Sequence, residues 1–317
     1  MNQPKIVYFG SPEIAVPCLE ALHRMGFPIL EVWCQPDKPQ GRGQKIDSPA
    51  VKIKAIDLGL PVFQPAKIDQ TCFSRLQQLK PDVIVVVAYG HKLSNDVIHL
   101  PAFGCVNVHF SLLPRWRGAS CVAQAILNGD TETGVSTMLI QEGPVDSGPV
   151  LLQKSLPILP ADTTQSLSLR LATLAPEILL KTLAGLLAKT LVFKAQDETQ
   201  VTHAPKIKKE AGKINWQQEA RKIDHLVRAM FPWPGAFTFF KNKKVILNQV
   251  TLCQDRNMGS IEPGVLKWVK NQGLLVGCKS GFLKIAKILP EGKREMSGEE
   301  FARGYCHEKN STFHFVS

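Results

Sequence analysis

The first half of the chain alternates short apolar runs with amphipathic segments. This repetition of a buried strand followed by a crossover helix is typical of an α/β fold with a parallel sheet. The expected strands cover residues 6–9, 29–34, 83–88, 105–109 and 134–141, and the expected helices cover 14–25, 49–58, 119–127 and 164–187, the last as one helix or two. We therefore predict a Rossmann-like parallel sheet covered by helices.

Local signals add detail to this pattern. Residues 83–88 show no polar alternation, which favours a central strand covered on both faces. Ser48 precedes Pro49 at the start of one predicted helix, and serine as N-cap with proline in the first turn is a start signal. The chemistry of such a sheet lies beyond the carboxyl ends of its strands. The turn at 10–12 lacks the G-x-G-x-x-G spacing, and no Walker A sequence is present, so neither fingerprint indicates a nucleotide.

The second half predicts a different kind of domain. Residues 189–209 turn polar, and a helix is expected near 219–229. Short strand-like runs follow at 236–240, 244–251, 264–269, 273–277 and 282–288, separated by Gly, Asn and Lys, which suggests a small OB-like β-barrel. With 317 residues and 44% apolar content the chain can bury two cores. We expect an N-terminal domain at 1–189, a linker at 190–208 and the barrel at 209–317.

Positive charge is concentrated in the C-terminal part. The formal net charge is +11, and residues 1–189 hold 17 Lys and Arg against 15 Asp and Glu, whereas residues 190–317 hold 21 against 12. A domain this basic favours a polyanionic partner, because each neutralised phosphate releases counterions. A surface that is merely soluble and positively charged is the alternative.

The cysteines and the hydropathy indicate the cellular environment of the protein. Eight cysteines are scattered without a C-x-x-C pair, which suits a reducing cytoplasm and argues against a structural zinc site. The longest apolar run, residues 83–89, is far shorter than the roughly 20 residues of a membrane helix, and no export signal is visible. We expect a cytoplasmic protein that needs no metal and does not enter a membrane.

The most informative segment is 107–118. Asn107 and His109 are two residues apart on a predicted strand, so their side chains point to the same face. An amide N–H beside an imidazole N–H suits the negative oxygen that forms when a carbonyl carbon is attacked. By itself such a histidine is more often structural than functional; the neighbouring Asn107 and the following loop favour a functional role for His109.

This segment, Asn-Val-His-Phe-Ser-Leu-Leu-Pro-Arg-Trp-Arg-Gly, resembles the signature of the folate-dependent formyltransferases. Its Arg-Trp-Arg-Gly ending is similar to the branch of the family that acts on methionyl-tRNA. Residues 10–12, 35–43, 87–90 and 231–236 resemble further parts of the family, so the resemblance extends over essentially the whole chain. It implies transfer of a formyl group from 10-formyltetrahydrofolate to the amino group of an initiator methionyl-tRNA.

The resemblance also implies a catalytic set of Asn107, His109 and Asp146. On its own, an aspartate in the Pro/Gly-rich turn 143–148 would be a turn former. As a catalytic residue, the carboxylate could fix the imidazole tautomer, favour its protonated form, or help to remove the proton of the attacking amine. Two positions depart from the family: Phe110 replaces a small residue, and Pro144-Val145 replaces a Gly-Leu pair.

Binding residues follow from the same resemblance. Ser111, Leu112, Leu113 and Pro114 match the folate-binding loop of the family, and Tyr89 and Gly90 are possible walls of the pocket or ordinary strand-end turns. For the tRNA we expect Lys38, Arg42 and Lys45 in a Gly/Pro-rich loop, and Lys206, Lys208 and Lys209 of the linker as phosphate contacts. The loop could also be a solvated charged surface. We expect a monomer.

Three other functions remain open at this point. A formyltransferase for a small amine would use the same three side chains, but the basic C-terminal domain argues against it. A hydrolase that releases formate from the folate gives no reason for a basic barrel. A noncatalytic RNA-binding protein on a remnant enzyme fold predicts the loss of at least one of Asn107, His109 and Asp146, and all three are present.

Overall fold

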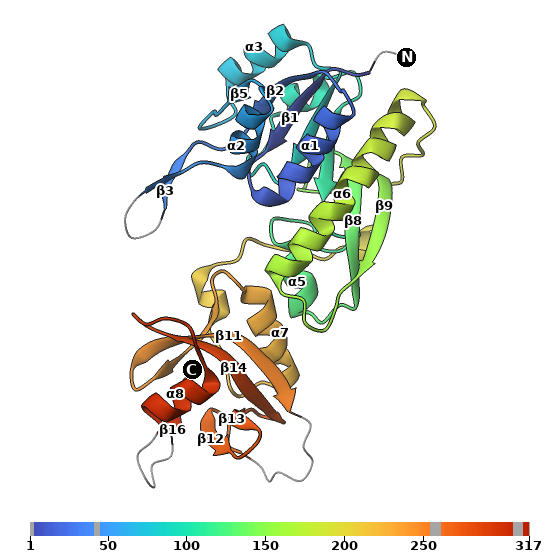
Figure 1. Cartoon of the computed structure of the whole chain (residues 1–317). Helices are drawn as coiled ribbons and strands as arrows, with labels where there is room; N and C mark the ends of the chain where they lie inside the picture. Colours follow the sequence, from blue (N-terminus) through green and yellow to red (C-terminus); the bar gives the residue numbers. More distant parts are fainter. Residues whose placement is uncertain (1–2, 41–44, 254–260, 307–312, 317) are drawn as a thin grey trace. The chain divides into compact units, whose positions relative to one another are not determined.

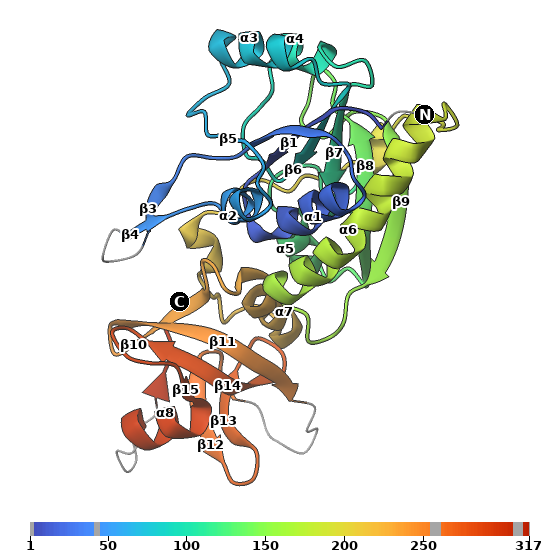
Figure 2. The same ribbon diagram turned by 45° about the horizontal axis from the view of Figure 1, so that its top comes forward.

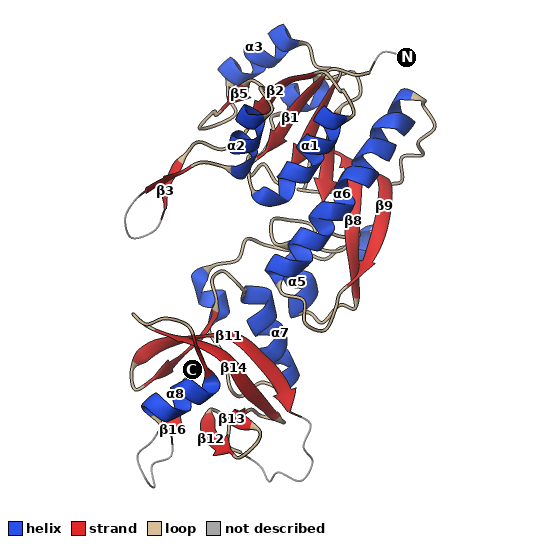
Figure 3. Cartoon of the chain, in the orientation of Figure 1, coloured by secondary structure: helices blue, strands red, loops and turns tan. Residues whose placement is uncertain are grey.

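The computed structural model describes residues 3–40, 45–253, 261–306 and 313–316, and Figures 1, 2 and 3 show their course. The chain divides into two compact units. The first comprises Met1–Cys121, Glu132–Pro157 and Ser168–Pro205, and the second comprises Val122–Thr131, Ile158–Leu167 and Lys206–Ser317. Each unit contains its own sheet, drawn in red in Figure 3.

The first unit is built on a seven-stranded sheet with the order β5-β2-β1-β6-β7-β8-β9. The strands are β1 (Ile6–Gly10), β2 (Ile29–Trp33), β5 (Val62–Phe63), β6 (Val83–Val87), β7 (Cys105–His109), β8 (Glu132–Leu139) and β9 (Val150–Pro157). The five strands from β5 to β7 are parallel, which confirms the predicted Rossmann-like α/β fold. The expectation of an all-parallel sheet was wrong for β8, which pairs antiparallel with both β7 and β9.

Helices cover both faces of this sheet. They are α1 (Val16–Arg24), α2 (Ala50–Asp57), α3 (Gln70–Leu79), α4 (Asn95–His99) and α6 (Thr164–Leu187), whereas α5 (Cys121–Leu127) belongs, apart from Cys121, to the second unit. On one face, Phe9 stacks on Trp33 at 4.8 Å within a cluster that includes α3 and α4 side chains. On the other, the hydroxyl groups of Thr137 in β8 and Thr182 in α6 are 2.7 Å apart; Figures 1 and 2 show α1 and α6 over the same face. All of β6 is buried, as expected for a central strand.

Some local expectations need correction. The N-cap of α2 is Pro49 rather than Ser48, and no side chain caps this helix, because the helix begins only at Ala50. α6 is one continuous helix that contains Pro176. The sequence patterns did not predict α3, α4, β9 or the short hairpin of β3 (Lys38–Gln40) and β4 (Lys45–Asp47). Short 3₁₀ turns cover Glu13–Ala15 and Glu198–Gln200.

The second unit contains the predicted β-barrel. Its strands follow the order β10-β11-β14-β13-β12-β16: β10 (Ala236–Phe240), β11 (Lys243–Cys253), β12 (Val265–Val269), β13 (Gly273–Gly277), β14 (Phe282–Pro290) and β16 (Phe313–His314), with β15 (Met296–Ser297) beside β14. Two hydrogen bonds between Val316 and Phe239 join the last residues to β10. The sheet thus closes on itself, which removes the unpaired edges of an open sheet.

Aromatic side chains fill this barrel. Phe240, Phe301 and Phe315 are buried and lie within 6.4 Å of one another, measured between ring centroids. Phe301 comes from α8 (Gly298–Tyr305), which begins with a capping box between Ser297 and Glu300. A further helix, α7 (Ala220–Met230), follows a 3₁₀ turn at Lys209–Gly212 and buries one of its faces.

Candidate active site

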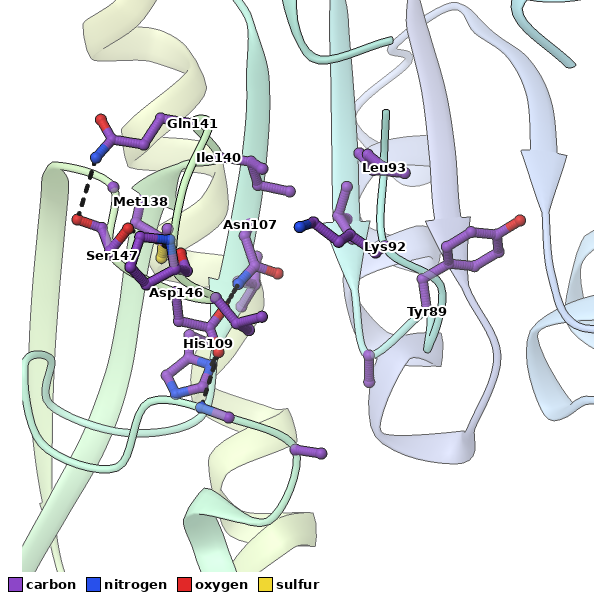
Figure 4. Close-up of a pocket in the computed structure, with 18 of the residues that line it drawn as sticks. Tyr89, Lys92, Leu93, Asn107, His109, Met138, Ile140, Gln141, Asp146 and Ser147 are labelled. Atoms are coloured by element: carbon purple, nitrogen blue, oxygen red, sulfur yellow. Dashed lines mark hydrogen bonds and ion pairs between the residues drawn. The ribbon is translucent and has the colours of Figure 1, made fainter. Parts of the chain in front are cut away.

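A cavity of about 450 Å³ opens at the carboxyl ends of β6 and β7 in the first unit. Its lining comes from the end of β6 and the residues after it (86–93), from Ile98 of α4, from the end of β7 (107–110), from residues 118–121, and from β8 and its loop (138–148). Figure 4 shows Asn107, His109 and Asp146 pointing toward one another. This is the edge at which a parallel sheet places its chemistry.

Asn107 and His109 reach the cavity from β7. Both are nearly buried, with 9% and 6% of their surface exposed, and both line the cavity. β7 pairs with β6 on one side and with β8 on the other, where His109 is opposite Ser136. Because the strand is held on both sides, the two side chains have little freedom to turn away from each other.

Asp146 joins them from the loop between β8 and β9. One carboxylate oxygen accepts a hydrogen bond from Asn107 Nδ2 at 3.3 Å. The other accepts from the backbone N–H of Gly118 at 2.9 Å and lies 3.6 Å from His109 Nδ1. Asp146 has a φ of 56°, a left-handed conformation that is strained for a residue other than glycine. The structure thus brings the three predicted catalytic side chains together.

The orientation of the imidazole is set by a backbone carbonyl. His109 Nε2 donates a hydrogen bond to the Trp116 carbonyl at 2.9 Å, since a carbonyl oxygen can only accept. Trp116 also has a positive φ, 61°, and its N–H donates to Thr202 Oγ1 at 2.8 Å. Nε2 therefore carries a proton in either charge state, and Nδ1 is the nitrogen that faces Asp146.

These neighbours favour the charged imidazole. Burial by itself lowers the pKa of His109, but Cys121, Asp146 and the Trp116 carbonyl together outweigh it and raise this pKa to about 9. The ring is then an imidazolium at neutral pH. Such a group donates from both nitrogens and is suited to stabilising a negative oxygen rather than to accepting a proton.

Gly118 is required where the loop after β7 meets Asp146. Its φ is 124°, and a Cβ atom there would lie 2.5 Å from the Ala204 carbonyl oxygen. We expect Gly118→Ala to lower the free energy of unfolding by about 2–4 kcal/mol, through backbone strain and the clash. Gly143→Ala is the control, since Gly143 also has a positive φ, 114°, but no atom within 4 Å of an added Cβ. Urea denaturation of both variants should show the larger loss for Gly118; equal losses would contradict the steric argument.

The predicted folate residues separate into two groups. Tyr89 and Gly90 line the cavity, whereas Ser111, Leu112, Leu113 and Pro114 do not. The Ser111 hydroxyl donates to the Arg115 carbonyl at 2.7 Å, and the Leu113 N–H donates to Ser136 Oγ at 3.1 Å. The loop 111–114 therefore folds back against β8, and it is Phe110 that borders the cavity.

Of the predicted tRNA residues, Lys38, Lys206, Lys208 and Lys209 are not among the residues that line the cavity. Lys206, Lys208 and Lys209 are exposed in the second unit. Lys38 is exposed on β3, and its Nζ lies 3.5 Å from Gln35 Oε1. Lys45 belongs to β4, and Arg42 lies outside the described residues.

Three residues near the site had no assigned role in the sequence. Gly118 donates its N–H to Asp146, Cys121 lines the cavity beside His109, and Gln196 donates to the Asp146 carbonyl at 2.8 Å. The motif 107–118 marks only the first of them. Gln196 lies 50 residues from Asp146 in a polar stretch, where no local pattern signals it.

The described part of the chain holds no group of three or more His, Cys, Asp or Glu side chains arranged for a metal ion. Within the same residues, none of the helices combines the length and the apolar content that crossing a membrane requires.

Comparison with known families matches both halves of the sequence. The model described as "Formyl transferase" matches residues 4–183, and "Formyl transferase, C-terminal domain" matches residues 206–306. A protein named methionyl-tRNA formyltransferase from Thermodesulfovibrio yellowstonii is 41% identical over 300 residues, covering 94% of this chain and 95% of its own. One with the same name from Methylococcus capsulatus is 45% identical over 306 residues, covering 95% and 97%.

Solved structures share the fold. An N-formyltransferase from Helicobacter canadensis, in complex with folinic acid and dTDP-3-aminofucose, aligns with a TM-score of 0.65 over 91% of this chain and 98% of its own. HypX from Aquifex aeolicus in complex with tetrahydrofolic acid aligns with a TM-score of 0.63 over 99% of this chain and 51% of its own. Their sequence identities are 19% and 15%, so the likeness concerns the fold.

Proposed function

The chain belongs to the formyl transferase family, and on that premise we propose that it transfers the formyl group of 10-formyltetrahydrofolate to the amino group of methionyl-initiator tRNA. The product is N-formylmethionyl-tRNA for translation initiation. The meeting of Asn107, His109 and Asp146 in one cavity carries the chemical part of the proposal. Relatives named methionyl-tRNA formyltransferase, aligned over nearly the whole chain, support the choice of acceptor.

The reaction needs charge stabilisation at one oxygen and the movement of one proton. The amine nitrogen attacks the formyl carbon, whose oxygen becomes negative; the carbon–nitrogen bond to the folate then breaks, and a proton passes from the amine to the departing nitrogen. Asn107 Nδ2 has two hydrogens, of which one points to Asp146, so the other can bind this oxygen. Protonated His109 is the second donor, through its Nδ1–H, because Nε2 already donates to the Trp116 carbonyl.

Asp146 would act both before and during this step. Its carboxylate interacts with the imidazolium and the Asn107 amide, and so fixes the two donors before the substrate arrives. It is also the acidic side chain among the cavity-lining residues, and we assign to it, directly or through a water molecule, the transfer of the amine proton.

The cavity is the proposed folate site. Its volume, about 450 Å³, falls in the range of pockets that enclose compact organic ligands, and most of its lining is apolar. Tyr89 and Gly90 would form one wall. In this proposal residues 111–114 support the site from behind by holding Phe110 in the wall, rather than by direct contact with the folate.

The charge distribution supports a binding role for the C-terminal part. We propose a catalytic domain followed by a tRNA-binding barrel domain at 209–317, acting as a monomer in the cytoplasm. The catalytic domain extends beyond the predicted boundary at 189, because the first unit includes the chain up to Pro205. Lys38, Arg42 and Lys45 would approach the acceptor end of the tRNA, and Lys206, Lys208 and Lys209 would contact phosphates. Such contacts hold any tRNA backbone and do not distinguish the initiator by themselves.

Removing the linker lysines should change the salt dependence of binding. We expect the variant with Lys206, Lys208 and Lys209 all replaced by alanine to bind tRNA more weakly. The slope of log K against log[salt] should fall by about one for each lost phosphate contact. Lys181→Ala is the control, because Lys181 is also exposed but is paired with Glu177 at 2.8 Å. Filter binding at several salt concentrations measures both slopes; equal slopes for the triple variant and the wild type would rule out these contacts.

One assay tests the proposed function as a whole. The protein is incubated with 10-formyltetrahydrofolate and, in separate reactions, methionyl-initiator tRNA, uncharged tRNA and glycinamide ribonucleotide. We expect formylation of the charged tRNA alone. Formylation of the ribonucleotide alone would identify a small-amine formyltransferase, and release of formate without any acceptor would identify a hydrolase; either result would replace the proposal.

A further inference from the structure

The loop that carries Asp146 has little support of its own. Its residues 141–145 are exposed, and Val145 has 63% of its surface in solvent. Inside the loop, Ser147 bonds to the Pro144 carbonyl and Gln141 approaches the Ser147 carbonyl. Neither contact fixes the strained backbone of Asp146 itself, so the position of its carboxylate depends on contacts from elsewhere.

Gln196 provides such contacts with every polar atom of its side chain. Its Nε2 donates to the Asp146 carbonyl at 2.8 Å and to the Gly148 carbonyl at 2.7 Å. An amide nitrogen has two hydrogens, and here both are used on the carbonyls to either side of Ser147. Its Oε1 accepts from Arg117 Nε at 3.0 Å. The side chain thus connects the Asp146 loop to the loop that follows β7.

Arg117 fixes the other end of this connection. Its side chain is 4% exposed, and its two terminal nitrogens donate to the Glu198 carboxylate at 3.2 and 2.7 Å. A guanidinium bound in this bidentate manner has one preferred orientation. The Nε atom that Gln196 accepts from is therefore itself held in place.

The backbone on both sides of Gln196 is also anchored within the first unit. Before it, Lys194 exchanges two hydrogen bonds with Val150 at the start of β9, at 2.8 and 3.0 Å. After it, the Arg117 N–H donates to the Thr202 carbonyl at 2.9 Å, and the Ala204 N–H donates to the Arg117 carbonyl at 2.7 Å. Residues 194–204 thus run along both catalytic loops rather than forming a free tether.

We infer that Gln196 is a positioning residue for formyl transfer: its amide fixes the backbone of the Asp146 loop, and thereby the carboxylate, against Asn107 and His109. The inference rests on the proposed function for its kinetic consequence. Gln196 does not line the cavity, so its effect passes through Asp146.

The Gln196→Glu variant distinguishes this positioning role from a general stabilisation of residues 194–204. The carboxylate has the same size and still accepts from Arg117, but it has no hydrogen to donate to the two carbonyls. We expect kcat to fall at least about ten-fold, since small displacements of a catalytic group are costly, while the Kd for tRNA stays within two-fold of wild type. Gln200→Glu, an exposed position in the same segment, is the control and should leave both values unchanged. An unchanged kcat, or a loss confined to tRNA affinity, would overturn the inference.

Gln196→Asn gives a readout that does not depend on the substrate. The shorter side chain keeps its amide but cannot reach both partners, so the Asp146 carboxylate should move away from His109. Asp146 is one of the groups that raise the pKa of this histidine, and moving its carboxylate away should lower that pKa. NMR titration of the His109 ring measures this shift, and an identical titration in wild type and variant would refute the positioning role. Failure of the wild type to formylate methionyl-tRNA would instead count against the proposed function.

Discussion

Replacing His109 by alanine is expected to lower kcat about a hundred- to a thousand-fold, which is the typical cost of losing one donor to a developing negative oxygen. The ring is nearly buried, oriented by the Trp116 carbonyl and held in its charged form, so the variant loses a donor that is fixed in place before the reaction. Single-turnover kinetics with 10-formyltetrahydrofolate and methionyl-initiator tRNA measure the chemical step directly.

Binding of the tRNA should hardly change in this variant. Lys38, Lys206, Lys208 and Lys209, which are proposed to contact the tRNA, do not line the cavity, so the Kd for methionyl-tRNA should stay close to the wild-type value. His23→Ala on α1 is the matched control, because His23 is exposed and does not line the cavity. A variant of His109 that loses affinity but retains kcat would show that the histidine binds substrate rather than stabilising the transition state.

Asp146→Asn should have an effect of similar size and a distinctive pH dependence. The amide keeps the shape of the carboxylate but removes the negative charge 3.6 Å from His109 Nδ1. The pKa of His109, about 9 in the intact site, should fall, because one of the groups that raise it is lost. At neutral pH a smaller fraction of the ring is then charged, and the proposed proton transfer from the amine is lost as well. We expect kcat to fall by about a hundred-fold or more.

The pH–rate profile separates these effects. In the wild type, activity should rise as the substrate amine loses its proton and fall as the pH passes through about 9, where His109 becomes neutral. The charged ring also stabilises the folded state. This contribution is complete below the ordinary histidine pKa and is lost as the pH rises through about 9. In Asp146→Asn the alkaline limb should move to lower pH. A limb that stays in place would mean that Asp146 does not control the charge of His109.

Part of the site follows from the sequence by simple geometry. Asn107 and His109 are two positions apart on a strand, and alternation of side chains is enough to place them together. Asp146 could not be placed in this way, since it lies in a loop with a left-handed backbone and was identified by family resemblance. The position of residues 111–114 was also not predictable, because it depends on Ser136, a residue of β8 in the interior of the sheet.

The fold likewise contains elements that local sequence patterns predict and contacts between residues far apart in the sequence that they do not. Buried strands such as β6 carry a clear apolar pattern, and their places along the chain were predicted. α8 was missed although its capping box, Ser297 with Glu300, is visible in the sequence, because only Gly298 and Phe301 of this helix are buried and no repeated apolar face marks it. The role of Gln196 depends on hydrogen bonds that span 48 and 50 residues, and no pattern within a window of the sequence reports contacts of that range.

The path of residues 194–204 determines how the chain could be divided. A fragment ending at residue 189, just after α6, would omit the stretch that borders both catalytic loops, and Arg117 would then be left as a buried cation without its carboxylate. A fragment ending at Pro205 would retain Gln196, Glu198 and the backbone bonds to Arg117. A fragment that keeps the contacts of the active site must therefore extend to Pro205, where the first unit ends.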